Sequence, residues 1–401
     1  MAQEARQSID RHLHVQGLAT HLIADLPSFS DIRPYIERID AVRWYSNFGQ
    51  LVLELEHKLT QLLTAADRTP AHGAIALTTM STCYHALEVG LQMLGIKEGD
   101  KVLIPAVTFP ACPLSVRHLG AEPILADVDP DLWVLTPSTA RQAALAMKLA
   151  AVMPVAVYGI PLPAAEWDTF SRETGIPVII DAAAAIESQQ IPRHGLVAHS
   201  LHATKPFGVG EGGLLVGRDA DVIQRARNYS NFGTVDRIAH SDGSNTKMSE
   251  YHAAVGLAQL TRWADIKKKR RALLILYCKH LLPFDEQISL HPGMDSTVAS
   301  LLMLRSAKPL PADIIARAKE DGLALHRTYL PPLYRHPYFA GLQTIGTDGK
   351  ILKTTDAKQK AAQMTHSEMM LKHVIGVPFH PFLDEDDIGR ASAILRLIID
   401  I

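Results

Sequence analysis

Short apolar runs alternate with longer helix-like segments over residues 71–217. The runs KVLIPA, EPILADV, AAVMPVAVY and PVIID are rich in aliphatic residues and carry few polar interruptions. Strands of this kind are typical of parallel sheets with both faces covered, and alternation with helices places those helices on the two faces. The pattern therefore predicts an α/β fold with three α/β/α layers around a mostly parallel mixed sheet.

The pattern changes after about Trp263. We expect a helical segment around residues 356–372, after the polar stretch TIGTDGKILKTTD, and a further strand in VIGVPFHPFL. The run KKKRR at 267–271 is interpreted as a solvated helix face. Because 401 residues exceed the usual size of one core, we expect a large domain over 1–262 and a smaller α+β domain over 263–401.

Composition and charge narrow the classes of partner. The 40 basic and 42 acidic residues give a net charge of -2, which offers no basic surface to nucleic acid or to an anionic membrane. The N-terminal run MAQEARQSIDRHLHVQ lacks the apolar core of a secretory signal. The most apolar run, 149–165, is too short and too broken by prolines to span a bilayer. Cys83, Cys112 and Cys278 form no C-x-x-C pair, which fits a reducing cytoplasm.

Two ionisable residues follow apolar runs, at the sheet edge where ligands bind in α/β folds. Asp181 follows the apolar run PVII, and Lys205 lies between SLHAT and the glycine-rich stretch PFGVGEGG. Taken alone, the aspartate is more often a helix cap or surface group, and most lysines are simply exposed. A buried carboxylate needs a cationic partner, such as a protonated pyridine nitrogen. A partly buried lysine beside a cationic cofactor can act as nucleophile and proton carrier.

A phosphate site is expected where TTMSTCYHALEVGLQMLGI passes from hydroxyl-rich residues into an amphipathic helix. Thr82, Cys83 and Tyr84 lie at that entry. Helix N-termini bind anions, although an ordinary N-cap explains the same residues.

Other chemistries have weaker support. The stretch 208–213 matches G-x-G-x-x-G, but its glycines precede a strand instead of opening a helix, which argues against a dinucleotide site. His199 and His202 have no third ligand in the pattern, so no metal site is predicted. Neither a G-x-S-x-G elbow nor a P-loop occurs in the sequence.

Taken in order, the segments from about Trp44 to Leu383 resemble the DegT-type nucleotide-sugar aminotransferases, members of fold type I of the enzymes that use pyridoxal 5'-phosphate (PLP). Several motifs in one order are far more specific than any one of them. The resemblance implies an aspartate aminotransferase-like fold, PLP as cofactor, nucleotide-sugar and amino-acid substrates, and a homodimer with shared active sites. It is carried by RWYSNFGQLVLELEHKL, GIKEGDKVLIPAVTFPACPLSVRHLGAEPILADVDPDLW, PVAVYGIPL, PVIIDAAAA, SLHATKPFGVGEGG, RNYSNFG, NTKMSEYHAAVGLAQL, HRTYLPPLYRHPYF and GVPFHPFL.

The resemblance also implies roles for single residues. Lys205 carries the cofactor as a Schiff base, and Asp181 meets its pyridine nitrogen. Phe109 stacks on the ring, and Ser200 binds the phosphate with the helix-entry turn. Asn245 reaches the phosphate of the other subunit.

Three positions depart from the family pattern. The turn 82–84 reads Thr-Cys-Tyr where Ser-Gly-Thr or Asn-Ala-Thr is usual. Ala184 stands where Gln or His commonly contacts the cofactor ring, so this contact is absent or comes from elsewhere. PPLY replaces PPLH, so Tyr334 is expected in place of a histidine that handles the sugar. Arg327 and Tyr329 of the same segment are also expected to contact substrate.

For the reaction, the resemblance implies transfer of an amino group, with L-glutamate as expected donor, to a keto group of a nucleotide-diphosphate deoxysugar. NFG and the opening WYSNFG favour C4 of a dTDP- or GDP-linked 4-keto-6-deoxyhexose, while C3 and an eight-carbon keto sugar acid stay open. Two alternatives keep the fold. Related sugar dehydratases have histidine in place of Lys205, and a regulatory protein would have lost turnover.

Overall fold

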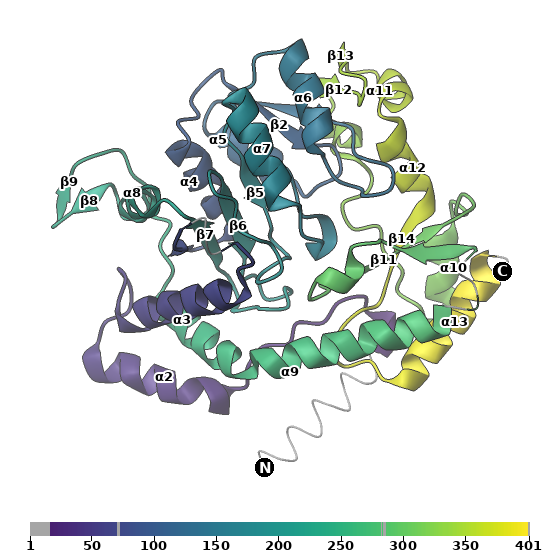
Figure 1. Cartoon of the computed structure of the whole chain (residues 1–401). Helices are drawn as coiled ribbons and strands as arrows, with labels where there is room; N and C mark the ends of the chain where they lie inside the picture. Colours follow the sequence, from purple (N-terminus) through teal and green to yellow (C-terminus); the bar gives the residue numbers. More distant parts are fainter. Residues whose placement is uncertain (1–16, 70–72, 282, 284–285, 400–401) are drawn as a thin grey trace.

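The computed structural model describes residues 17–69, 73–281, 283 and 286–399 (Figure 1). The N-terminal run 1–16, in which no secretory signal is expected, lies outside the described residues. The α-helices are α2 (Phe29–Val42), α3 (Gln50–Ala66), α4 (Cys83–Met93), α5 (Ala111–His118), α6 (Pro137–Ala146), α7 (Ala164–Thr174), α8 (Ala220–Ser230), α9 (Glu250–Leu281), α10 (Ile314–Glu320), α11 (Ala357–Gln363), α12 (Thr365–His373) and α13 (Glu385–Ile399). The strands are β1 (Ala76–Met80), β2 (Lys101–Pro105), β3 (Glu122–Ala126), β4 (Ala151–Val152), β5 (Ile179–Asp181), β6 (Leu196–Ser200), β7 (Gly213–Gly217), β8 (Thr234–Val235), β9 (Ile238–Ala239), β10 (Ile288–Leu290), β11 (Leu302–Ser306), β12 (Thr344–Ile345), β13 (Ile351–Leu352) and β14 (Val374–Val377).

The main sheet has the order β1-β7-β6-β5-β4-β2-β3-β12-β13. Strand β6 pairs in parallel with β5, and the neighbours β4, β2, β3 and β12 also pair in parallel in that order. Strand β7 pairs antiparallel with β1 and with β6. Two isolated parallel bridges, Val152 to Val178 and Val155 to Asp181, join β4 to β5. The predicted mostly parallel mixed sheet is confirmed, and each expected apolar run from 101 to 181 contains a strand.

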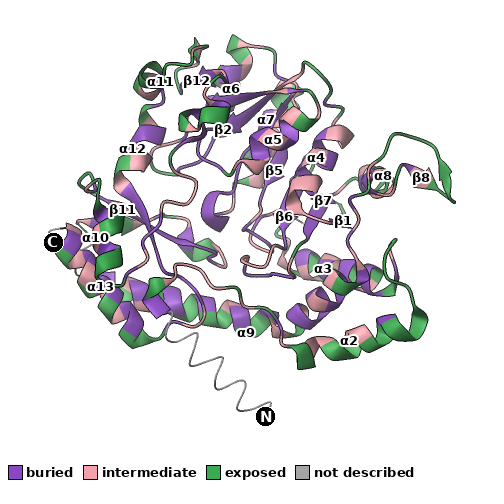
Figure 2. Cartoon of the chain, turned by 180° about the vertical axis from the view of Figure 1, so that it is seen from behind, coloured by how far each residue is buried: buried purple, intermediate pink, exposed green. Residues whose placement is uncertain are grey.

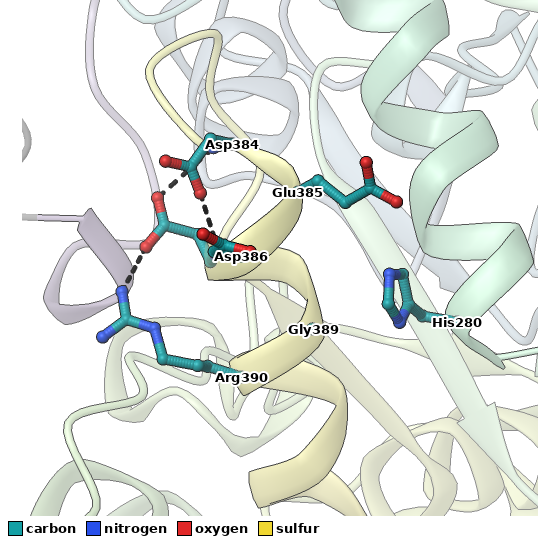
Figure 3. Close-up of a pocket in the computed structure, with 7 residues that line it drawn as sticks. His280, Asp384, Glu385, Asp386, Gly389 and Arg390 are labelled. Carbon is teal, nitrogen blue, oxygen red and sulfur yellow. Dashed lines mark hydrogen bonds and ion pairs between the residues drawn. The ribbon is translucent and has the colours of Figure 1, made fainter.

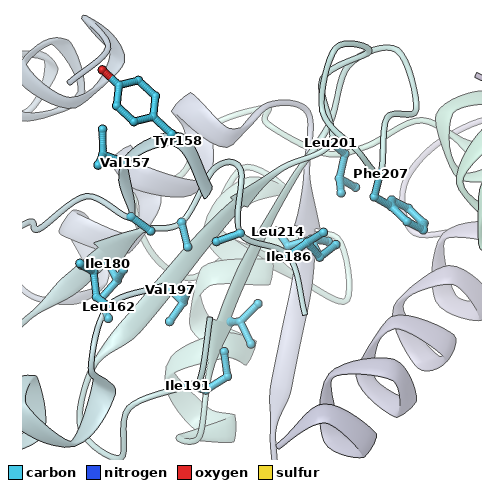
Figure 4. Packing of buried hydrophobic residues seen from close by; sticks show 14 of the residues in the cluster. Val157, Tyr158, Leu162, Ile180, Ile186, Ile191, Val197, Leu201, Phe207 and Leu214 are labelled. Atoms are coloured by element: carbon cyan, nitrogen blue, oxygen red, sulfur yellow. The ribbon is translucent and has the colours of Figure 1, made fainter. Parts of the chain in front are cut away.

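Helices cover both faces of this sheet, as Figure 2 shows by the buried strands between partly exposed helices. Alternate strand residues enter different cores, because successive side chains point to opposite faces. Leu103 packs in a cluster with residues of α3, α6, α7 and α9, whereas Val102 and Ile104 pack in a second cluster with residues of α4, α5 and α8. Figure 4 shows part of the first cluster, with Ile180 and Val197 on neighbouring strands. The predicted three layers are therefore present.

A smaller antiparallel sheet, β10-β11-β14, packs with α10, α13 and the end of α9 around a third core. Helix α9 runs unbroken through the boundary expected at residue 263, so it belongs to both parts. Within the run 267–271, Lys268, Lys269 and Arg271 are exposed, but Arg270 is buried and donates from Nη1 to the Ala299 carbonyl at 2.9 Å. The interpretation of this run as a solvated face is therefore wrong for one residue. Of the helices in the described ranges, none is long and apolar enough to cross a membrane.

The polar stretch before α11 forms a hairpin, β12–β13, that extends the main sheet. Strand β12 pairs in parallel with β3, and Leu125 donates to the Gln343 carbonyl at 2.9 Å. Leu333 and Phe339, just upstream, pack in the second core of the main sheet. Part of the chain after residue 263 thus returns to the larger unit.

Glu250, the first residue of α9, holds the start of α3. Its buried carboxylate accepts the backbone N–H of Leu51 at 2.7 Å and of Val52 at 3.2 Å. The first N–H groups of a helix have no partner within the helix, and a negative charge there also complements the helix dipole. This contact joins helices that lie 199 residues apart in sequence.

We predict that Glu250→Ala lowers the free energy of unfolding by about 1–3 kcal/mol, because two buried N–H groups lose their acceptor. Glu250→Gln, which keeps one acceptor oxygen, should lose less. Urea unfolding monitored by circular dichroism measures both, with the exposed Glu320→Gln as matched control. Equal stability of Glu250→Ala and the wild type would contradict this role.

Candidate active site

A cavity of about 600 Å³ opens at the carboxyl ends of three neighbouring strands. It is lined by Ala156 after β4, by Asp181 at the end of β5 and by Ser200 at the end of β6, together with Lys205 from the following loop. This is the edge at which α/β sheets bind ligands, and the volume lies within the usual range for small-molecule sites, about 300–1,000 Å³. The predicted aspartate and lysine therefore share one cavity.

Asp181 is 4% exposed and is held from two sides. Oδ1 accepts the Ala183 N–H at 3.0 Å, and Oδ2 accepts the Cys112 thiol at 3.0 Å. Burial raises the pKa of Asp181, while the two hydrogen bonds and the charge of Lys205 act in the opposite direction. A buried carboxylate with this surrounding is suited to a cationic ligand group.

Lys205 lies on a tight loop between β6 and β7. Its N–H donates to the His202 carbonyl at 2.9 Å, and Ala203 N–H donates to the Gly210 carbonyl at 2.7 Å. A Cβ at Gly213 would lie 2.4 Å from the carbonyl carbon of Thr82. The glycines after the lysine thus allow its loop to pack against the entry of α4, which is a role unrelated to dinucleotide binding.

The expected phosphate turn faces the same cavity. Thr82 is the N-cap of α4 and accepts the His85 N–H at 3.2 Å, and Thr82, Cys83, Tyr84 and His85 all line the cavity. Burial raises the pKa of the Cys83 thiol well above its usual range, and burial beside Glu88 raises the pKa of Tyr84 to about 12. Both side chains are therefore neutral at pH 7, and the helix terminus supplies the attraction for an anion.

Three further residues from the sequence prediction line the cavity. Phe109 is 59% exposed and contacts Tyr329 edge to face, with ring centroids 6.4 Å apart. Tyr329 also stacks on Tyr158 at 5.3 Å. Ala184 lines the cavity with a methyl group only, so it offers no polar contact to a ring.

The other sequence-predicted residues lie apart from this lining. Tyr334 is fully buried in the second core and donates its hydroxyl to Glu368 at 2.7 Å, so the expectation that it handles a sugar is not supported by its position. Arg327 is half-buried outside the lining, and its Nε has no hydrogen-bond partner. Asn245 is exposed and accepts from the Lys247 amine at 2.5 Å.

Several residues that line the cavity are not among those predicted from the sequence. His85 accompanies the phosphate turn, with Nδ1 lying 2.8 Å from the Ser81 hydroxyl, and an i, i+4 spacing from a hydroxyl could have indicated it. His21, Ser300 and Thr328 line the cavity from segments far from the motifs. No local pattern marks them, because only the packing of the chain brings them together.

The two histidines singled out in the sequence lie close to hydrogen-bonding groups of the protein. His199 is buried on β6, where its Nδ1 lies 3.0 Å from the Ala182 carbonyl and burial lowers its pKa to about 4. His202, on the cavity side, lies 2.9 Å from the Thr204 hydroxyl. Over the described ranges, no three histidine, cysteine, aspartate or glutamate side chains converge as a metal site would require.

A second hollow, of about 850 Å³, lies beside the start of α13 (Figure 3). Two of its acidic residues are engaged with the helix itself: Asp387 donates its N–H to Asp384 Oδ1 at 2.8 Å, and Arg390 contacts Asp387. These contacts cap the helix, so we assign the active site to the cavity at the strand ends.

The arrangement can therefore hold a compact anionic ligand at the α4 terminus and a cationic ring nitrogen at Asp181, with an amine in reach. Comparison with known proteins agrees with this geometry. Residues 29–396 match the family model described as the DegT/DnrJ/EryC1/StrS aminotransferase family, and the chain belongs to this family. Fold-type I enzymes of this family carry PLP or its amine form, so the sequence prediction of a PLP-dependent transaminase is confirmed.

Particular relatives act on nucleotide sugars. GDP-perosamine synthase of Escherichia coli O157:H7 is 28% identical over 62% of this chain and 68% of its own length. The UDP-N-acetyl-3-dehydro-alpha-D-glucosamine 3-aminotransferase of Acidithiobacillus ferrooxidans is 26% identical over 78% of this chain and 81% of its own. The crystal structure of DesI with its TDP-sugar product superposes with a TM-score of 0.76 at 25% identity, covering 95% of this chain and 92% of that one.

We predict that Gly213→Ala lowers the free energy of unfolding by about 1–3 kcal/mol, because the added methyl group forces the lysine loop away from Thr82. Affinity for PLP should fall with it. Gly341→Ala is the matched control, since a Cβ there meets open space, and it should change stability by less than about 0.5 kcal/mol. Chemical unfolding and PLP titration measure both effects, and equal behaviour of the two variants would argue against the close packing.

Proposed function

We propose that this enzyme transfers an amino group from L-glutamate to C4 of a dTDP- or GDP-linked 4-keto-6-deoxyhexose. The observation that carries the proposal is that Asp181 and Lys205 line one cavity together with the N-terminus of α4. The relatives that act on GDP- and TDP-linked sugars support the substrate class. Glutamate as donor, and C4 instead of C3, are carried over from the resemblance of the motifs.

The residues present fit PLP. Asp181 supplies a buried acceptor for a protonated ring nitrogen, and Phe109 exposes an aromatic face at the cavity. The α4 terminus and the Ser200 hydroxyl offer donors for a phosphate. These groups come from separate segments and meet only in this cavity, as a cofactor with one charged group at each end would need.

When bound, PLP supplies an electron sink for the exchange of an amino group for a keto oxygen. Asp181 would orient the ring by accepting a hydrogen bond from its protonated nitrogen, and the charge of the carboxylate would keep that proton in place. Lys205 Nζ holds the resting cofactor and, once freed by substrate, carries a proton from one reacting carbon to the other. Phe109 and Tyr329 shield the reacting atoms from water with their rings.

Neutral polar groups line the part of the cavity wall that comes from segments outside the predicted motifs. His21, Ser300 and Thr328 offer hydrogen bonds without a fixed charge, and burial lowers the pKa of His21, so its ring is neutral at pH 7. Such groups suit the hydroxyls of a sugar. Arg327 is the nearby cation that we assign to the carboxylate of the donor or to the diphosphate, because its half-buried guanidinium retains an unpaired Nε.

We also propose a homodimer in which each subunit completes the site of its partner. Apolar side chains are exposed around the starts of α3 and α9 and on the β8–β9 arm, which extends from the same side of the molecule in Figure 1. Trp44, Phe232 and Ile238 are 53%, 55% and 62% exposed, and large exposed apolar side chains of this kind are typical of interaction surfaces. Asn245 follows this arm in the sequence, and its exposed side chain supports the proposed contact with the phosphate of another subunit.

We predict that Lys205→Ala lowers the rate of amino transfer by at least about a hundredfold, because the proton carrier is removed. Borohydride treatment of the wild type should fix PLP on the peptide that contains Lys205, seen by mass spectrometry. The product from a 4-keto-6-deoxyhexose nucleotide should carry nitrogen at C4 by NMR. Lys268→Ala, an exposed lysine of α9, is the control. Product at the normal rate from Lys205→Ala would remove this mechanism, and a deoxygenated product would indicate a dehydratase.

Subunit mixing tests the shared site. Asn245→Ala should weaken PLP binding about tenfold through loss of a charged hydrogen bond, and Lys205→Ala should be inactive. After the two variants are unfolded together and refolded, half of the dimers are mixed and each holds one native site. At a PLP concentration near the wild-type dissociation constant, where Asn245→Ala dimers bind little PLP, activity should recover to about a quarter of the wild type. No recovery, or a monomer in analytical ultracentrifugation, would contradict the proposal.

A further inference from the structure

A short chain of polar groups leads from Asp181 to Cys112 and Thr108. Cys112 Sγ is 3.0 Å from Asp181 Oδ2 and 3.2 Å from the Thr108 hydroxyl. Cys112 is fully buried, and Thr108 is 2% exposed. Water is therefore excluded from Cys112, and the thiol proton must be shared among these groups.

The direction of the chain follows from the protons available. An ionised carboxylate only accepts, so the single Cys112 proton points to Asp181. The Thr108 hydroxyl then donates to the sulfur. Burial beside Asp181 raises the pKa of the Cys112 thiol well above its usual range, so the proton stays on sulfur at neutral pH.

The thiol has a specific effect on the carboxylate. Oδ1 is held by the Ala183 N–H, and Cys112 fixes Oδ2, so rotation of the carboxylate would break one of the two contacts. A thiol is a weak donor. It therefore fixes the orientation of Asp181 while leaving most of its basicity for a ligand in the cavity.

We propose that Cys112 is a positioning residue that acts through Asp181, holding the carboxylate so that it retains a proton on the cofactor's ring nitrogen. The inference rests on the proposed function. It adds a role for a residue that core packing alone would also explain, since Cys112 lies in the second hydrophobic cluster beside Val116 and Ile104.

A double-mutant cycle separates the two explanations. The variants are Cys112→Ala, Cys112→Ser, Asp181→Asn and Cys112→Ala with Asp181→Asn, with Cys278→Ala on α9 as a cysteine control outside the site. Two readouts do not depend on turnover: the dissociation constant of PLP, and the visible absorption of bound PLP as a function of pH. The other titratable groups that act on Asp181 or its neighbours are Lys205, Cys83 and Tyr329, and none of them is altered.

Cys112→Ala should raise the PLP dissociation constant about tenfold and shift the pH dependence of the absorption, because one oxygen of the buried carboxylate loses its donor. Cys112→Ser retains a donor and should stay within about threefold of the wild type. In the Asp181→Asn background, Cys112→Ala should have less than about a twofold effect. Cys278→Ala should match the wild type.

Equal effects of Cys112→Ala in the two backgrounds, or a Cys112→Ser variant as weak as Cys112→Ala, would show a packing role and overturn the inference. If Cys112→Ala does not fold, Thr108→Val in both backgrounds carries the same test, with an expected effect of about threefold that vanishes with Asp181→Asn. Failure of the wild type to bind PLP at Lys205 would instead refute the proposed function.

Discussion

The rest of the site depends on the cost of burying the Asp181 carboxylate. A charge with 4% exposure must be compensated by nearby donors and cations. Backbone and thiol hydrogen bonds hold its two oxygens, and the Lys205 amine lies in the same cavity. These contacts leave the carboxylate under-compensated by protein groups alone, since burial still raises its pKa. Under the proposed function, a cationic ring nitrogen would complete this balance.

The cavity is lined by two chemically distinct groups of residues. The α4 terminus and the hydroxyls of Thr82 and Ser200 suit a phosphate, and the neutral Cys83 and Tyr84 add no negative charge. His21 and Thr328 come from segments outside the sheet and offer hydrogen bonds without charge. Under the proposed function, the strand ends would hold the cofactor, and the segments outside the sheet would contact the substrate.

Much of this arrangement could be predicted because the signals are local. Asp181 and Lys205 each follow a buried strand, and parallel strands end at one edge, so their meeting follows from the fold. Tyr334 could not be placed in this way, because its side chain turns into the core to reach Glu368, which lies 34 residues further on. The β12–β13 hairpin could not be predicted because its sequence is mostly polar and shows no strand pattern. The burial of Arg270 depends on an acceptor 29 residues away. Long-range partners of this kind leave no periodic pattern.

Helix α9 has a further mechanical consequence. Its 32 residues extend for about 48 Å at 1.5 Å per residue, starting at the cap of α3 and ending in the core of the smaller sheet. Both parts of the molecule contribute walls to the cavity and share this one rod. A movement of one part relative to the other would therefore have to bend this helix or break one of its end contacts.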